Sequence, residues 1–124
     1  MKAWIPFLIL ALGSAAHAQA ACTYPHSPDA PPDGATATKD QMIAAKHDFD
    51  RYNGEMNAYL DCLKLEIDSA VPKDPKKLTV EEQKKADEQQ KMLVQKNNAA
   101  VDELQANVGR FNEQLKIFKA KNNH

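Results

Sequence analysis

The sequence has little of what multidomain enzymes, membrane proteins and nucleic-acid binders need. Its 124 residues include four glycines, two cysteines, one tryptophan and 6% aromatic residues, and the formal net charge is −1. A chain of this length allows one small domain at most, which argues against a multidomain enzyme. No long apolar run follows residue 12, so a polytopic membrane protein is not expected. The nearly balanced charge gives no reason to expect a nucleic-acid partner.

Motifs for catalysis and ligand binding are also missing. The sequence contains no Gly-rich phosphate loop, no His-Glu-x-x-His motif, no Gly-x-Ser-x-Gly turn and no EF-hand calcium loop. The carboxylates between Glu81 and Glu88 alternate with lysines, a pattern typical of an exposed helix face. Acid and base chemistry needs a sheltered pocket that shifts a pKa, and a small helical scaffold offers little depth. We therefore expect a non-enzymatic protein without a cofactor.

The first twenty residues have the layout of a secretory signal peptide. Lys2 precedes an apolar run over 3–12, and small residues at positions 16, 18 and 20 fit a signal-peptidase site. The run is shorter than the roughly 20 residues that a spanning helix needs, so no membrane span is expected after removal of 1–20. Cleavage after position 18 or 20 stays open, as does lipidation of Cys22, although Gln19 is not the apolar residue that a lipobox has. The sequence thus predicts a periplasmic or extracellular protein.

Two cysteines, Cys22 and Cys62, follow this leader. In an oxidising compartment they most simply form one intramolecular disulfide. Their separation of forty residues is too long for a redox-active Cys-x-x-Cys pair, and two cysteines are too few for a four-cysteine zinc site. The alternatives are an intermolecular bridge, or a lipidated Cys22 with Cys62 left unbridged.

Beyond the leader the chain divides into a proline-rich arm and two helices. Residues 21–38 carry several prolines and a Pro-Asp-Gly turn, which favour extended and turn structure. Two capping boxes predict helices over about 39–70 and 80–120, and the short connector makes them antiparallel neighbours within 39–124. The predicted fold class is all-α: an elongated antiparallel two-helix hairpin whose arm is tied back along the first helix by the disulfide.

Each predicted helix carries an apolar stripe. Steps of three and four residues place large apolar residues on one face of each helix, and we expect the two faces to meet in the core. The members are Met42, Ala45, Phe49, Tyr52, Met56, Tyr59 and Leu63 in the first helix, and Val94, Val101, Leu104, Val108, Phe111, Leu115 and Phe118 in the second, with Leu93 and Ala100 beside them.

The stripe of the first helix is wider than one partner helix covers. Ile43, Leu60, Leu63 and Ile67 broaden it, and we expect these four residues to form an interaction face. Its occupant would be a protein partner or a second copy of the chain, since a self-associated four-helix bundle would cover such a face.

Candidate metal ligands are few. His26 lies in the arm, and His47 and Asp50 are three residues apart on the first helix. A metal site normally needs three or four ligands, so the expected interpretation is a solvated polar face and no metal is predicted.

One set of residues resembles a group of short exported all-helical proteobacterial proteins of unknown function. The resemblance covers most of the chain after the leader. It implies export and the cysteine pair, and it brings no catalytic or binding residues. It is carried by the run Pro32–Thr38, by Met42, Tyr52 and Tyr59-Leu-Asp-Cys62, and by Phe111-Asn-Glu-Gln-Leu115 with Phe118-Lys119.

Three functional hypotheses follow. The first is an exported helical protein that acts through protein–protein contact or self-association. The second is a periplasmic holdase chaperone, because the long charged hairpin resembles in shape the projecting arms of the Skp family, with no matching residues. The third is a metal-handling module built on His26, His47 and Asp50.

Overall fold

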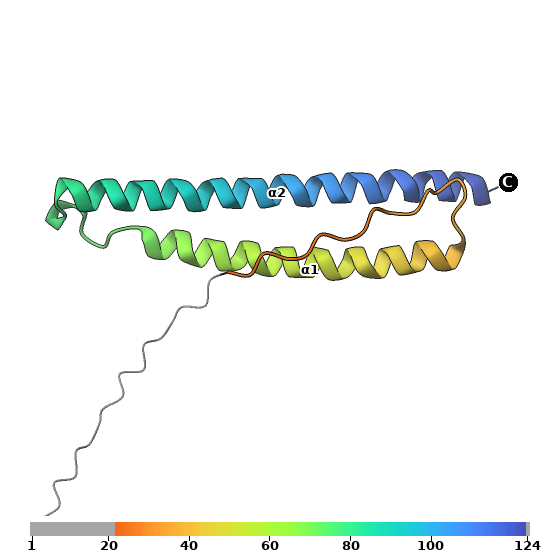
Figure 1. Cartoon of the computed structure of the whole chain (residues 1–124), viewed down its shortest axis with the longest axis horizontal. Helices are drawn as coiled ribbons and strands as arrows, with labels where there is room; N and C mark the ends of the chain where they lie inside the picture. The colour runs from red at the N-terminus through yellow and green to blue at the C-terminus, as the bar shows by residue number, and fades with distance from the viewer. Residues whose placement is uncertain (1–21, 124) are drawn as a thin grey trace, which may run out of the picture.

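Two long antiparallel helices and an extended arm make up the fold. The computed structural model describes residues 22–123, so the predicted signal peptide over 1–20 and its cleavage site lie outside the described residues. Helix α1 covers Lys39–Ala70, a short 3-10 turn, η1, covers Pro75–Lys77, and helix α2 covers Val80–Asn122. No strand occurs between residues 22 and 123 (Figure 1), and no helix there is long and apolar enough to cross a membrane. The predicted all-α hairpin is confirmed.

Both helices begin at the predicted capping boxes. Thr38 Oγ1 accepts a hydrogen bond from Gln41 N at 3.2 Å, and Gln41 Oε1 accepts one from Thr38 N at 2.9 Å. Thr79 and Glu82 form the same reciprocal pair at the start of α2, with distances of 3.2 and 2.8 Å. Each box satisfies backbone N–H groups in the first turn that no helical carbonyl can reach. These four residues therefore fix where the two helices start.

The core is a narrow layer between α1 and α2. Tyr52 and Met56 are fully buried and Leu63 is 1% exposed, and they cluster with Leu93 and Ala100 of α2. Every residue of the stripe predicted for α1 is buried or half-buried, so that prediction is confirmed. A second apolar contact lies nearer the start of α1, where the rings of Phe49 and Phe111 stack with centroids 5.1 Å apart.

The stripe predicted for α2 is confirmed in part: Phe111 is 7% exposed and Leu104 packs against the core, but the buried residues that alternate with them lie one position before the predicted valines. The buried residues include Leu93, Ala100 and Asn107, which follow one another at intervals of seven, whereas Val94 is 41% exposed. The sequence pattern gave the valines more weight than an alanine and an asparagine. In the structure α1 packs on the column that contains these smaller and more polar residues, and the valine column is left at the edge of the hairpin.

Candidate functional site

The arm, residues 22–38, is fixed at its start by the predicted intramolecular disulfide. Cys22 is bonded to Cys62 of α1, with Cα atoms 5.7 Å apart, and neither cysteine is left unbridged. From there the arm runs antiparallel to α1 until it reaches the first residue of that helix (Figure 1). Tyr24 meets Tyr59 edge to face, with ring centroids 4.9 Å apart. The arm is therefore strapped to the hairpin, as the sequence predicted.

Glu103 of α2 holds the first part of the arm. The hydroxyls of Tyr24 and Ser27 each donate a hydrogen bond to one of its carboxylate oxygens, and the Tyr52 hydroxyl of α1 donates another at 3.3 Å. These bonds lower the pKa of Glu103, with the Ser27 bond having the largest effect. One carboxylate thus links the arm, α1 and α2. Sequence reasoning missed Glu103, because its position in the pattern resembles that of any exposed helical glutamate.

The pKa values of the three tyrosines near the arm are raised. Burial is the main cause for Tyr24, Tyr52 and Tyr59, because it penalises the charged phenolate. At Tyr24 the hydrogen bond to Glu103 adds to the effect, although the residue as a whole is 45% exposed. The neutral hydroxyl of Tyr24 is therefore the form that the docked arm requires.

The far end of the arm is fixed by Gly34. Its N–H donates to Gln114 Oε1 at 2.8 Å, and a Cβ placed on Gly34 would lie 2.1 Å from Gln114 O and 2.8 Å from Phe118 N. Any larger residue would therefore clash with the backbone of α2. Lys121 Nζ donates to Ala37 O at 2.9 Å. The arm is thus held at its start, middle and end, and it contacts both helices rather than the first alone.

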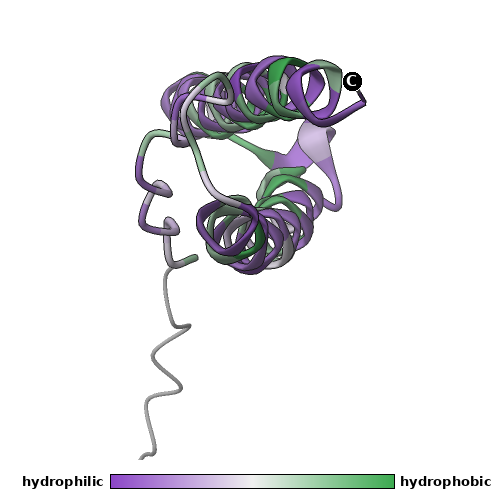
Figure 2. Cartoon of the chain, turned by 90° about the vertical axis from the view of Figure 1, so that its right-hand side faces the viewer, coloured by the Kyte–Doolittle hydropathy of each residue, from purple (hydrophilic) through white to green (hydrophobic). Residues whose placement is uncertain are grey.

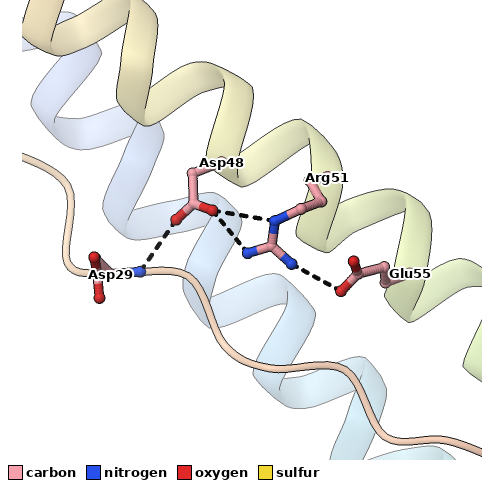
Figure 3. Close-up of polar contacts among 4 residues, drawn as sticks. All are labelled: Asp29, Asp48, Arg51 and Glu55. Carbon is pink, nitrogen blue, oxygen red and sulfur yellow. Dashed lines mark hydrogen bonds and ion pairs between the residues drawn. The ribbon is translucent and has the colours of Figure 1, made fainter.

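Arg51 joins two carboxylates on the arm side of α1. It donates to Asp48 Oδ1 at 2.7 Å and to Glu55 Oε2 at 2.9 Å, and Asp48 also accepts a longer bond from Asp29 N at 3.4 Å (Figure 3). The bond from Arg51 lowers the pKa of Asp48. Asp48 therefore stays ionised near neutral pH and is a weak base, while the exposed ion pairs themselves add little stability.

An open hollow of about 270 Å³ lies under the middle of the arm. Pro28 and Pro31 of the arm form one wall, and Phe49 and Asn107 of the helices contribute to the other. Its lining includes the carboxylates of Asp29 and Asp48 and no histidine, cysteine or serine. The hollow therefore offers a small molecule shape and two acidic side chains, but no thiol, hydroxyl or imidazole group.

The predicted metal candidates are not brought together. Among residues 22–123, the group of three possible ligands within 4.8 Å of one another is Cys22, Cys62 and Glu66, and its two sulfur atoms are joined in the disulfide. His26, His47 and Asp50 form no such group in that part of the chain.

The side of the helix pair opposite the arm is uncovered (Figure 2). Cys62 of α1 and Glu103 of α2 hold the arm, so their side chains mark the covered side of the hairpin. At about 100° per residue, Leu60 points about 160° away from Cys62, and Val94 and Val101 point about 180° and 160° away from Glu103. The residues on this side are half-buried, apart from the more exposed Val94. We define the open face as Leu60, Ile67, Val94, Val101, Val108 and Leu115.

The predicted interaction face is divided by the structure. Ile43 is 44% exposed, and Leu60 and Ile67 are half-buried on the open face. Leu63 is 1% exposed and belongs to the core, which corrects its place in the predicted face. It lies seven residues after Met56, so the two side chains share the direction that faces α2.

In comparisons with known proteins, no family model, no curated protein and no solved structure matches this chain. The fold and the contacts above define its class: an all-α hairpin with a disulfide-bonded arm covering one of its two sides.

Proposed function

We propose that this is a non-enzymatic exported protein that acts through protein–protein contact at the open face. The observation that carries the proposal is the difference between the two sides of the hairpin. One side is closed by the arm from Cys22 to Ala37, whereas the other leaves a half-buried apolar strip uncovered between Val94 and Leu115 of α2. Contiguous apolar strips of this kind are typical of binding surfaces.

Export is part of the proposal. A disulfide that closes a loop of forty residues persists in an oxidising compartment and is rare in the cytosol. The signal-peptide layout of residues 1–20 supports the same location. We place the protein in the periplasm or outside the cell.

A photo-crosslinking amino acid on α2 tests the proposed contact. Gln105 and Ala106 are both exposed neighbours, but a step of about 100° directs only Gln105 toward the open face. After irradiation of cells that export the protein, the crosslinker at position 105 should join it to another protein chain, and the crosslinker at position 106 should do so little or not at all. Equal products from both positions, or none from either, would contradict a contact at the open face.

A holdase chaperone is the second candidate, and the connector end of the hairpin favours it. Leu65, Val71, Val80 and Met92 are 68%, 50%, 89% and 48% exposed there, which makes them the four most exposed large apolar residues between 22 and 123. Exposed apolar residues gathered at one end of a molecule are a feature of binding surfaces. Unfolded clients would bind such residues. Stoichiometric protein should then suppress the turbidity of an aggregating client, and the double variant Leu65→Ser/Val80→Ser should suppress it less. Unchanged turbidity with the wild-type protein would remove this candidate.

A further inference from the structure

We propose that the occupant of the open face is a second copy of this chain, and that two hairpins form a four-helix bundle. This inference rests on the proposed function, since it names the partner of the same face.

Helix α2 carries two adjacent columns of residues spaced by seven. The first column, which includes Leu93, Ala100 and Asn107, faces α1. The second column consists of Val94, Val101, Val108 and Leu115, and it lies on the open face. A helix with one neighbour needs the first column together with Leu104 and Phe111, which alternate with it in a coiled-coil seam, whereas a core-facing helix of a bundle carries a further column such as the second one.

Helix α1 repeats this arrangement. Met56 and Leu63 face α2, while Leu60 and Ile67, which are also seven residues apart, are half-buried on the open side. The second columns of both helices thus lie on the same side of the hairpin. One hairpin therefore has the pattern of half a bundle, with the remaining half missing from the open side.

The polar residues around the open face allow the open face of a second copy to pack against it without like-charge repulsion. Charged residues in the middle of the strip would repel their own copies across a symmetric contact. The exposed or half-exposed polar residues there are mostly uncharged amides: Asn53 and Asn57 of α1, and Asn98, Gln105 and Asn112 of α2. Lys64 also borders the strip, and its long side chain can carry the amine to the edge of the contact.

The size of the face is sufficient for a dimer. Val94 to Leu115 spans about 32 Å along α2, and two helices side by side are about 20 Å wide, which gives on the order of 600 Å² per copy. Two copies would bury about 1,200 Å² in total, the lower end of the range for stable interfaces.

Sedimentation of the purified, oxidised protein over a range of concentrations tests the second copy. We expect a species of twice the chain mass that dissociates on dilution. Asn98→Arg/Asn112→Arg adds like charges to the open face at exposed positions and should weaken the dimer by about tenfold or more. The matched control, Ala99→Arg/Glu113→Arg, changes the neighbouring exposed positions and should leave the dimer unchanged. Circular dichroism checks that both variants remain helical.

A monomer at every concentration up to about 0.1 mM would overturn the second copy as the occupant. If position 105 still crosslinks to a different protein, the proposed function stands with another partner. If the protein is monomeric and position 105 yields no product, both proposals fail.

Discussion

Gly34 of the arm lies directly against the backbone of Gln114 in α2, with room for a hydrogen atom and not for a methyl group. The glycine is not required by its own conformation, because no glycine between residues 22 and 123 has a positive φ. It is required because the arm and the helix backbone approach each other so closely. This contact fixes the part of the arm that the disulfide at Cys22 leaves unfixed.

Replacing Gly34 with alanine should detach this end of the arm. The added Cβ would lie 2.1 Å from Gln114 O, and a backbone atom cannot rotate out of the way. We expect Gly34→Ala to lower the free energy of unfolding by about 1–3 kcal/mol, measured by urea denaturation. Gly109→Ala is the control, because a Cβ there meets nothing within 4 Å and should stabilise α2 by about 0.5–1 kcal/mol. Equal effects of the two changes would contradict the close approach of Gly34.

Glu103→Gln should destabilise the protein in a pH-dependent way. The carboxylate accepts hydrogen bonds from Tyr24, Ser27 and Tyr52, and a neutral amide accepts them more weakly, so we expect a loss of about 1–2 kcal/mol near neutral pH. The pKa of Glu103 is lowered in the folded protein from its usual 4.5. The folded state therefore binds fewer protons than the unfolded state, and the wild-type advantage is lost as the pH falls from 4.5 through the folded pKa.

Urea denaturation of both proteins at several acidic and neutral pH values measures this difference. Glu113→Gln, which removes an exposed carboxylate ten residues farther along α2, serves as the control and should show no comparable effect. A constant gap between wild type and Glu103→Gln down to the lowest pH would show that Glu103 does not act through its charge.

The sequence predicted the features that depend on residues close together in the chain. Thr38 and Gln41 form a capping box, and Thr79 and Glu82 form another, because each box involves one helical turn. The disulfide was also predictable, since the sequence has only two cysteines.

Features that depend on tertiary distances were not predictable in the same way. Nothing in the heptad pattern distinguishes Glu103 from its neighbours until the arm places two hydroxyl groups beside it. The pattern also favoured Val94 and its column as the centre of the α2 stripe, because valine is more apolar than Ala100 or Asn107. The structure shows that α1 packs on the other column, which is what leaves the open face exposed.

The protein's three tyrosines should all resist ionisation. Burial raises the pKa of Tyr24, Tyr52 and Tyr59 above the usual tyrosine value of 10.0. Alkaline titration should therefore show little phenolate absorbance at pH 10.0, and most of it should appear together with unfolding. Because the neutral form is favoured in the folded state, this contribution to stability is present below pH 10.0 and is lost as the pH rises through the folded pKa. A normal titration in the absence of urea would contradict the docked position of these residues.

Opening the disulfide should release the start of the arm while the helices persist. Cys22 and Cys62 close a loop of forty residues, and a bridge of that length contributes about 3–4 kcal/mol by restricting the unfolded chain. We expect the double variant Cys22→Ala/Cys62→Ala to lose about this much in urea denaturation. Its helical circular dichroism should be retained at low urea, because α1 and α2 still pack through Met56, Leu63 and Leu93. A reducing agent should destabilise the wild type by a similar amount and leave the double variant unchanged, which separates the bridge from the loss of the sulfur atoms. An unchanged denaturation midpoint in the double variant would show that the arm is held by Glu103 and Gly34 alone.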